Sequence, residues 1–280
     1  MPELPEVQTV CDGIKNFVVG ARIIKAKIIN KKLRIEIPKS IEKLAGAKIQ
    51  QVRRKAKYII LELDNKKLLI IHLGMSGRLT VDQNIIGDYY HKKTNSQKHD
   101  HLKIILNNGF SLTYNDTRKF GLIDLIDSNQ ESSYKYFKHL GCEPLSENFT
   151  KQALEAICKS RTKNIKATIM DASLIVGVGN IYACEALFRA KILPERPAKT
   201  LSASELERLR KAIISTLEDA IKAGGSTIQD YANPNGEAGY FQHSFLVYDR
   251  ENQECKICKN KIIRVKDSGR STYYCTKCQK

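Results

Sequence analysis

Two Cys-x-x-Cys pairs near the carboxyl end of the sequence place the strongest constraint on what this chain can fold into. Cys255 and Cys258 form the first pair, and Cys275 and Cys278 form the second after sixteen residues. A two-residue gap lets both sulfurs of one turn face the same point, and four thiolates complete a closed tetrahedron. The spacing therefore predicts one structural Zn²⁺, with no open position for catalysis at the metal. Two disulfides are the alternative, which the absence of a recognisable secretion signal disfavours.

The segment between the two pairs is too short to form a hydrophobic core of its own. Residues 262–265 and 271–274 have the composition of two strands, and residues 266–270 are expected to form the tip of the hairpin. Residues 251–280 contain eight Lys or Arg and three acidic residues, a net charge of +5. We therefore expect a small sheet, held by the metal, that directs basic side chains toward a groove or a phosphate.

Positive charge extends over the whole chain of 280 residues. Lys and Arg number 47 against 30 Asp and Glu, so the formal net charge is +17. Charge of this size indicates a polyanionic partner, and nucleic acid is the first candidate. Ribosomal, heparin-type and membrane-surface partners stay open on charge alone. No stretch approaches the roughly 18 apolar residues of a membrane span, so we expect a cytosolic protein without a membrane partner.

The hydrophobic pattern divides the chain into successive parts. Residues 2–16 have helical periodicity, and the pattern from 21 to about 126 is strand-like, with repeated hairpins that suggest a two-sheet sandwich. After about residue 130 the periodicity is helical, and 226–242 has no clear period. The pattern predicts an α+β protein with domain boundaries at 1–130, 131–242 and 243–280.

Turn and cap residues place the individual elements. Polar residues at 64–66 and 107–109 are expected to be hairpin turns, and 82–98 a surface loop. Ser202 and Glu205 have the spacing of a capping box, and Gly224 follows the helix that they begin. The apolar stripe of that helix consists of Leu206, Leu209, Ile213, Leu217 and Ala220.

Pro2 is the second residue of the sequence, and two carboxylate residues, Glu3 and Glu6, follow it closely. Removal of Met1 would expose the Pro2 nitrogen as a secondary amine. An α-amino group titrates near ~7.8 and a lysine near ~10.4, so the terminal amine is far more often neutral at pH 7. A neutral amine can attack an electrophilic carbon and form a Schiff base. The alternative is a plain helix start, with proline at the first position and glutamate in the first turn.

Six short segments and the zinc pairs together resemble the bacterial formamidopyrimidine-DNA glycosylases, which excise oxidised purines during base excision repair. They are MPELPEV (1–7), RRKAKY (53–58), HLGMSG (72–77), KHDH (98–101), DTRKFG (116–121) and VGVGNIY (176–182). The resemblance implies a β-sandwich with an N-terminal helix, a helical helix–two-turns–helix domain and a zinc-finger hairpin. It also implies a monomeric, nucleoid-associated protein of the bacterial cytoplasm that acts on damaged double-stranded DNA. No cofactor beyond zinc is expected.

The resemblance assigns the catalytic roles of a bifunctional glycosylase/AP lyase. Pro2 is implied as the nucleophile, Glu3 as the proton donor to the sugar ring oxygen, and Glu6 as a supporting hydrogen-bond partner. Lys57 is implied to contact the phosphate at the lesion during β-elimination, and Arg270 the phosphate released by δ-elimination. From the residues alone, Lys57 could equally belong to a solvated charged edge, and Arg270 could be one more basic side chain.

The resemblance also assigns contacts to DNA. Met75, Arg118 and Phe120 are implied to fill the space left by the flipped base, although Met75 could equally fill a core. Asn180 is implied to hold a phosphate at a helix start, and its alternative is a plain N-cap. His99 and Arg161 match further contact positions. Gln229 stands where the family often has a basic residue, which puts one charge contact in doubt.

Two other functions remain open at this point. One is an endonuclease VIII-like glycosylase for oxidised pyrimidines, which shares the amine, the glutamate and the zinc hairpin. The other is a non-catalytic zinc-ribbon protein that binds nucleic acid, for which the charge and the cysteines alone would suffice.

Overall fold

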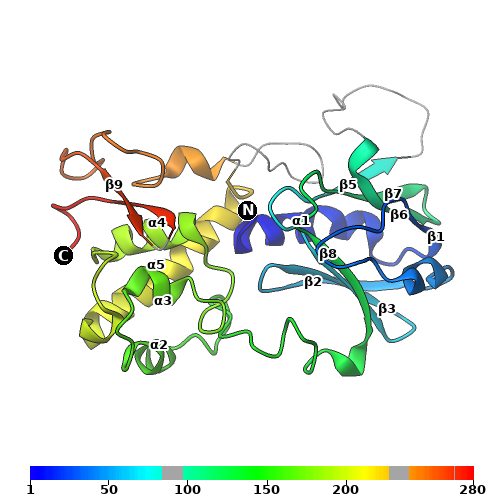
Figure 1. The fold of residues 1–280 in the computed structure, drawn as a ribbon, viewed down its shortest axis with the longest axis horizontal. Helices are drawn as coiled ribbons and strands as arrows, with labels where there is room; N and C mark the ends of the chain where they lie inside the picture. Colours follow the sequence, from blue (N-terminus) through cyan, green and yellow to red (C-terminus); the bar gives the residue numbers. More distant parts are fainter. Residues whose placement is uncertain (84–96, 227–239, 268) are drawn as a thin grey trace. The chain divides into compact units, whose positions relative to one another are not determined.

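The computed structural model describes residues 1–83, 97–226, 240–267 and 269–280. The chain divides into two compact units, Met1–Lys138 with Gly224–Gly239, and His139–Ala223 with Tyr240–Lys280 (Figure 1). The zinc hairpin thus falls in one unit with the helices that precede it. The three domain boundaries expected from the sequence remain a prediction.

The described residues of the first unit form one long helix and two four-stranded antiparallel sheets. Helix α1 (Leu4–Val18) begins the unit. One sheet has the order β1 (Ile23–Ile28), β6 (Asp100–Leu106), β7 (Phe110–Asn115) and β5 (Arg78–Gln83). The other has the order β2 (Ile49–Lys55), β3 (Tyr58–Leu63), β4 (Lys67–His72) and β8 (Leu122–Asp127). Short 3₁₀ helices lie at Lys39–Lys43, Gln97–His99 and Ser128–Gln130.

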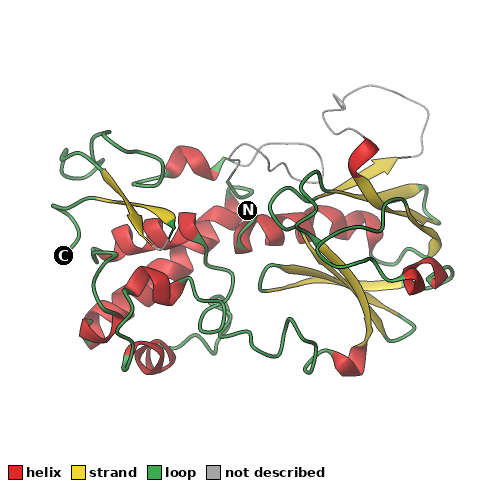
Figure 2. Cartoon of the chain, in the orientation of Figure 1, coloured by secondary structure: helices red, strands yellow, loops and turns green. Residues whose placement is uncertain are grey.

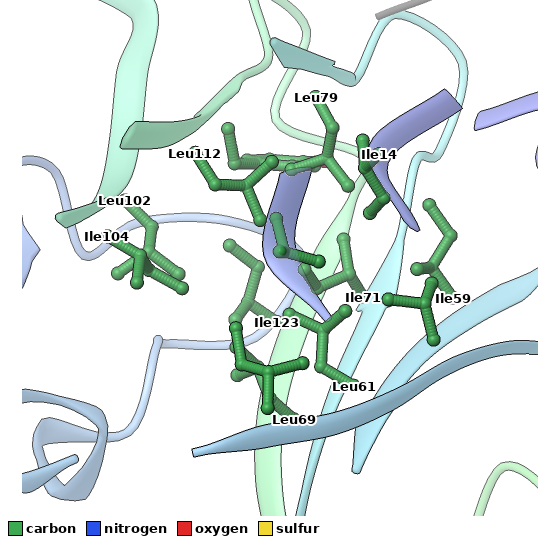
Figure 3. Packing of buried hydrophobic residues seen from close by; sticks show 14 of the residues in the cluster. Ile14, Ile59, Leu61, Leu69, Ile71, Leu79, Leu102, Ile104, Leu112 and Ile123 are labelled. Atoms are coloured by element: carbon green, nitrogen blue, oxygen red, sulfur yellow. The ribbon is translucent and has the colours of Figure 1, made fainter. Parts of the chain in front are cut away.

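Both sheets and α1 contribute to one hydrophobic core (Figure 3). Ile14 comes from α1, Leu112 from β7, and Leu69 and Ile71 from β4, and all four side chains are buried. Burial of one such side chain stabilises the fold by roughly 1.5–3 kcal/mol. The shared core confirms the predicted two-sheet sandwich, and it gives α1 a fixed base from which its N-terminus is presented.

The second unit is built on helices (Figure 2). They are α2 (Lys151–Cys158), α3 (Ile165–Ile169), α4 (Asn180–Ala190) and α5 (Ala203–Lys222), with short 3₁₀ helices at Ala198–Thr200 and Phe241–Ser244. Ser202 and Glu205 form the predicted capping box of α5, and the five residues of its predicted stripe are buried. Gly224 follows the helix with φ +73°, as expected for a helix end.

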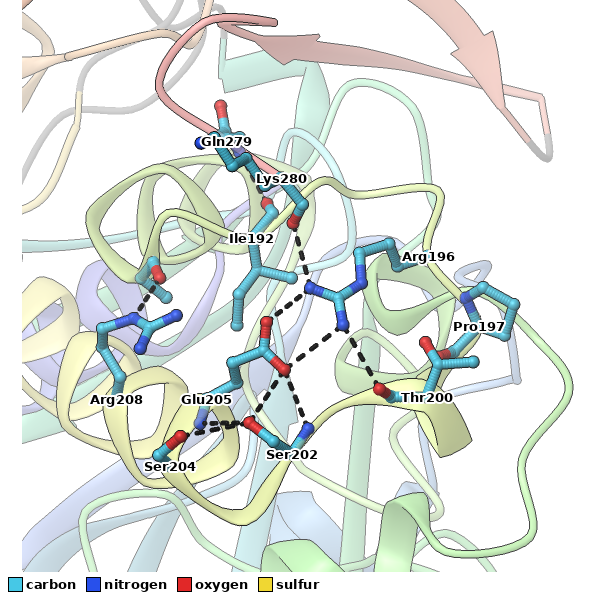
Figure 4. A network of polar contacts seen from close by, with 11 residues as sticks. Ile192, Arg196, Pro197, Thr200, Ser202, Ser204, Glu205, Arg208, Gln279 and Lys280 are labelled. Carbon is cyan, nitrogen blue, oxygen red and sulfur yellow. Dashed lines mark hydrogen bonds and ion pairs between the residues drawn. The ribbon is translucent and has the colours of Figure 1, made fainter.

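Polar contacts attach the C-terminal residues to these helices (Figure 4). The Arg196 guanidinium donates to the Glu205 carboxylate and to the Lys280 carbonyl. Gln279 donates to the Ile192 carbonyl at 2.8 Å. Glu185 of α4 accepts the backbone N–H groups of residues 246–248 at 2.8–2.9 Å. The segments before and after the zinc hairpin are therefore bonded to the helical part of the same unit.

The hairpin itself consists of β9 (Ile263–Asp267) and β10 (Arg270–Tyr274). Arg270 pairs with Asp267 in the antiparallel ladder, so the predicted tip at 266–270 is wrong in extent. The strands continue further because Gly269, at φ +77°, allows a tight turn. Arg270 therefore begins a strand instead of lying in a loose loop.

Two segments singled out in the sequence lie outside the described residues. Most of the predicted surface loop at 82–98 is among them, and so is Gln229 with most of the segment 226–242. In the part of the chain that the structure describes, no helix is long and apolar enough to cross a membrane.

Candidate active site and nucleic-acid interface

The four C-terminal cysteines form a compact sulfur cluster in the second unit. Their sulfur atoms all lie within 4.8 Å of one another. The Sγ atoms of Cys255 and Cys278 are 3.8 Å apart, and those of Cys258 and Cys275 are 3.4 Å apart. Zn–S bonds of about 2.3 Å in a tetrahedron separate the sulfurs by roughly 3.8 Å. The cluster therefore fits one structural Zn²⁺, and all eight cysteines are free, which excludes the disulfide alternative.

Pro2 and Glu3 lie at the N-terminal end of α1. Both are buried, whereas Met1 is 56% exposed. Glu3 is the N-cap residue, so Pro2 precedes the helix instead of beginning it. The plain helix-start interpretation of Pro2 is therefore wrong, and Pro5 is the proline in the first turn. Removal of the exposed Met1 would make the Pro2 nitrogen the chain terminus, one residue before the buried Glu3.

Glu6 holds this end of the helix in place. Its Oε2 accepts the Glu3 N–H at 2.8 Å. Its Oε1 accepts the N–H and the hydroxyl of Ser226 at 2.9 and 3.0 Å. A side chain added at Gly225 would meet Glu6 at 3.2 Å, and the φ of +81° there favours glycine. Glu6 thus links the helix start to Gly225 and Ser226, more than 200 residues along the chain.

Lys57 lies in the tight turn between β2 and β3. Ala56, beside it, adopts φ +53°, and its carbonyl accepts from Arg54 at 2.9 Å. Lys57 is half-buried, so it is not part of a fully solvated edge. It lies near enough to His72 to help lower the pKa of that ring.

His72 also lies at this site, and the sequence patterns assign it no role. Burial lowers its pKa to about 4, and the positive charges of Lys57 and Arg34 add to the effect. Its Nδ1 accepts the Gly74 N–H at 3.0 Å, so the proton of the neutral ring is on Nε2. The only sequence signal is a histidine ending an otherwise apolar strand.

Two loops that contact each other, residues 73–77 and 116–121, present Met75, Arg118 and Phe120. We call this pair the double loop. The buried Asp116 carboxylate accepts the Ser76 hydroxyl at 2.6 Å and the Gly121 N–H at 2.8 Å. The loops meet so closely that a side chain on Gly74 would lie 2.5 Å from the Gly121 nitrogen. The backbone of this double loop is therefore fixed by a buried carboxylate and by glycine.

The side chains on the double loop point outward. Met75 is 37% exposed and Phe120 is 49% exposed, and the Arg118 guanidinium lies 5.1 Å from the centre of the Phe120 ring. The alternative that Met75 fills a core is wrong. Exposed apolar side chains on a rigid backbone suit insertion between stacked bases. His99 is half-buried and contacts this double loop, since its carbonyl accepts the Asp116 N–H at 3.0 Å.

The second unit brings Asn180 and Arg270 together through Ser271. Asn180 is the first residue of α4, and Gly179 is the N-cap, so the plain N-cap interpretation of Asn180 is wrong. Its side-chain amide donates to the Ser271 carbonyl at 2.8 Å. Arg270, the neighbour of Ser271, is exposed. Arg161 is half-buried just after α2, with its charge close enough to lower the pKa of Asp171.

Three segments of the chain match models of known protein families. The formamidopyrimidine-DNA glycosylase N-terminal domain matches residues 1–123, and the H2TH domain of the same glycosylases matches residues 140–232. The zinc finger found in FPG and IleRS matches residues 252–280. The chain belongs to the formamidopyrimidine-DNA glycosylase family. The predicted family, fold class and zinc are thereby confirmed.

Individual members of the formamidopyrimidine-DNA glycosylase family align over full length. A formamidopyrimidine-DNA glycosylase of Ruegeria sp. is 42% identical over 283 residues and covers 100% of both chains. A Lactococcus lactis FPG variant, solved in complex with DNA containing Fapy-dG, has a TM-score of 0.88 and 34% identity, with 100% of both chains covered. The wild-type L. lactis protein, solved with DNA containing an oxidised pyrimidine, has a TM-score of 0.87 at 34% identity and 100% coverage of both chains.

Proposed function

We propose that this chain is a bifunctional DNA glycosylase/AP lyase of base excision repair that removes oxidised purines, with Pro2 as its nucleophile. Membership of the family makes it a DNA glycosylase for oxidised purines. The observation that supports the assignment of Pro2 is that Pro2 and the adjacent Glu3 are both buried at the start of α1, whereas Met1 is exposed. This places an amine that is partly neutral at pH 7 next to an acid.

The proposed reaction begins with a nucleotide flipped out of the duplex, because a stacked sugar is inaccessible. The Pro2 nitrogen attacks C1′, the glycosidic bond breaks, and the base leaves with a proton. Glu3 protonates O4′, and the sugar ring opens to give an iminium between C1′ and Pro2. This step needs Glu3 as the neutral acid, whereas a helix N-terminus favours the carboxylate. Glu6, already bonded to three donors, supports the helix start and does not transfer a proton.

Two eliminations then cut the strand. The iminium acidifies C2′, so loss of a C2′ proton expels the 3′ phosphate. Loss of a C4′ proton expels the 5′ phosphate, and water hydrolyses the iminium and frees Pro2. Lys57 contacts the phosphate at the lesion during the first elimination. Arg270 contacts the phosphate released by the second elimination, a role that suits a guanidinium because it stays charged at all relevant pH values. Zn²⁺ takes no part in these steps and holds the hairpin that carries Arg270.

The remaining residues bind the DNA. Met75 and Phe120 occupy the gap in the base stack, and Arg118 hydrogen-bonds the unpaired partner base. His99, Arg161 and Asn180 contact phosphates, which fits the net charge of +17. We propose that the protein acts as a monomer on damaged double-stranded DNA, and a chromosomal substrate places it at the nucleoid in the bacterial cytoplasm.

Borohydride trapping tests the nucleophile. Borohydride reduces the iminium, so the parent protein is expected to form a stable crosslink to a duplex containing 8-oxoguanine opposite cytosine. Intact mass before the reaction should show loss of Met1. Pro2→Gly replaces the secondary amine and is expected to lower the crosslink yield at least about tenfold. Pro38→Gly, a proline change in a loop of the same unit, is the control and should crosslink like the parent.

Two results would overturn the proposal. One is a Pro2→Gly protein that crosslinks as well as the parent, and the other is a fully active parent that retains Met1. The oxidised pyrimidine bound by the L. lactis protein keeps the endonuclease VIII-like specificity as a second candidate. Faster excision of thymine glycol than of 8-oxoguanine would favour that candidate.

A further inference from the structure

Lys166 is a buried lysine in α3, close to the tip of the zinc hairpin. Its side chain is 2% exposed, and its Nζ donates to the Thr272 hydroxyl at 2.7 Å and to the Ser271 carbonyl at 3.3 Å. Lysine is almost never fully buried unless its charge is paired or hydrogen-bonded. Both acceptors lie in β10, and they directly follow Arg270. The ammonium group therefore attaches the first residues of strand β10 to α3.

Asn164 holds the other strand of the same hairpin. It is the N-cap residue of α3, and its Oδ1 accepts the Ala167 N–H at 2.7 Å. Its Nδ2 donates to Asp267 Oδ2 at 2.9 Å. One amide thus fixes the start of α3 and the end of β9 at once. Asp267 is the ladder partner of Arg270, so this bond also acts on the last pair of the hairpin.

Two carboxylates line the pocket of Arg270 and would compete with a phosphate for its guanidinium if they had no other partners. Asp171 and Asp267 line the same open pocket as Arg270, together with Lys166 and Met170. Each carboxylate is already bonded, Asp267 to Asn164 and Asp171 to the hydroxyl and N–H of Ser173 at 2.6 and 3.0 Å. Among the described residues none forms an ion pair with Arg270, which is exposed. The hydrogen bonds keep both acids occupied and leave the guanidinium available.

We propose that Asn164 and Lys166 are positioning residues that clamp the two strands of the hairpin and so aim the Arg270 guanidinium at the phosphate released by the second elimination. This inference rests on the proposed function, because it takes Arg270 as the group that serves that phosphate. The clamp acts after the Schiff base has formed. Its loss should therefore slow loss of the C4′ proton and departure of the 5′ phosphate while leaving crosslinking to Pro2 intact.

Asn164→Asp is the sharpest test. Aspartate keeps the N-cap, because its carboxylate still accepts the Ala167 N–H. It also replaces the donor facing Asp267 by a second negative charge. On a duplex with an abasic site, we expect borohydride trapping within about twofold of the parent. The second elimination should slow about tenfold or more, as is typical when a catalytic group is displaced. The DNA strand cut only by the first elimination should therefore accumulate.

The reverse pairing supplies a rescue. In the double variant Asn164→Asp with Asp267→Asn, the amide and the carboxylate exchange places, and the hydrogen bond can form again. We expect most of the second-elimination rate to return. Absence of any rescue, with zinc content and trapping at parent values, would remove Asn164 from the clamp.

Lys166→Met tests the other strand. It removes the ammonium at similar length, and Lys211→Met is its control because Lys211 is 71% exposed on α5 in the same unit. We expect only Lys166→Met to slow the second elimination. Should it fail to fold, Thr272→Val removes one acceptor of Lys166 and Thr272→Ser retains it, so only the valine variant should be slow.

The outcome of the set is decisive. The inference fails if all clamp variants keep the parent ratio of products, or if trapping and the second elimination fall by the same factor. A parent protein that never traps on DNA would instead refute the proposed function, which separates the two failures.

Discussion

At the residue scale, His72 shows how burial sets the charge of the candidate site. The ring is held neutral at pH 7 because burial, with Lys57 and Arg34 nearby, lowers its pKa to about 4. The Gly74 N–H uses Nδ1 as acceptor, so Nε2 presents an N–H donor. The positive charge around this ring therefore comes from lysine and arginine, and the histidine adds a donor without adding charge.

This arrangement predicts the pH range over which protonation of His72 changes the stability of the protein. The folded pKa near 4 is below the unfolded value near 6.5, so the unfolded chain binds more protons between these values. The contribution of His72 to stability is therefore complete above about pH 6.5 and is lost as the pH falls to about 4. Its size is on the order of 3 kcal/mol. Two-bond ¹H–¹⁵N spectra should show the Nε2–H tautomer down to pH 5.5, and His72→Gln should flatten the pH dependence of unfolding in this window. A midpoint near 6.5 would contradict the prediction.

The sequence identified residues whose chemistry is local and missed those whose partners are distant. The four zinc cysteines are predictable because each pair lies within one turn. Lys166 reads as an ordinary helical lysine, and its burial depends on Ser271 and Thr272, 105 and 106 residues away. The sequence predicts a phosphate contact for Asn180, but it gives no sign that the amide of Asn180 also bonds a carbonyl 91 residues away. No pattern within one segment carries such information.

At the scale of elements, the N-terminus of α5 is stabilised by a small charged network. Glu205 accepts the Ser202 N–H at 2.8 Å and pairs with Arg196, which also bonds the Lys280 carbonyl (Figure 4). The Arg196 hydrogen bond lowers the pKa of Glu205 to about 2, and the Ser202 bonds add to this. One carboxylate thus serves the helix cap and the attachment of the C-terminus.

Glu205→Gln should reveal this double role. The folded pKa near 2 is below the usual 4.5, so the stability that Glu205 supplies is present above about pH 4.5 and is lost as the pH falls toward 2. We expect Glu205→Gln to lower the free energy of unfolding by about 1 kcal/mol at pH 7, and by less at pH 3. Urea unfolding at both pH values measures this. Glu218→Gln, on the same helix, is the control, and an equal loss at both pH values would contradict the role of the charge.

Elements with two-residue or helical periodicity were predictable, and their ends were less so. The hairpin pairs β3–β4 and β6–β7 and the buried face of α5 match the expected patterns. The two strands of the zinc hairpin pair further toward the tip than expected, because Arg270 pairs with Asp267 and Asn164 bonds Asp267. Helix α3 has only five residues, too few for a period, and it is defined by the Asn164 cap.

At the scale of the whole molecule, charge and metal have separate roles. The net charge of +17 suits binding to a polyanion whatever the fold. Order in the C-terminal hairpin instead depends on a local cluster in which Cys255 and Cys275 are buried with Phe188, Val247 and Ile262. This cluster is small, so the four sulfur–metal bonds supply most of its cohesion. The first unit has its own core and contains no cysteine of the zinc site.

Metal loss should therefore affect the two units differently. Binding of a structural Zn²⁺ contributes on the order of 10 kcal/mol in small zinc domains, so Cys258→Ser should abolish stoichiometric zinc and unfold the hairpin. Cys142→Ser, outside the cluster, is the control and should keep one zinc per chain. Metal analysis with unfolding curves should show an early transition in Cys258→Ser, while the later transition of the first unit stays at the parent temperature. Pro2 lies in that first unit, whereas Arg270 lies in the hairpin. In assays at high protein concentration, the Cys258→Ser variant should therefore still form the Schiff base but should no longer carry out the second elimination. Simultaneous loss of both transitions would mean that the two units do not fold independently.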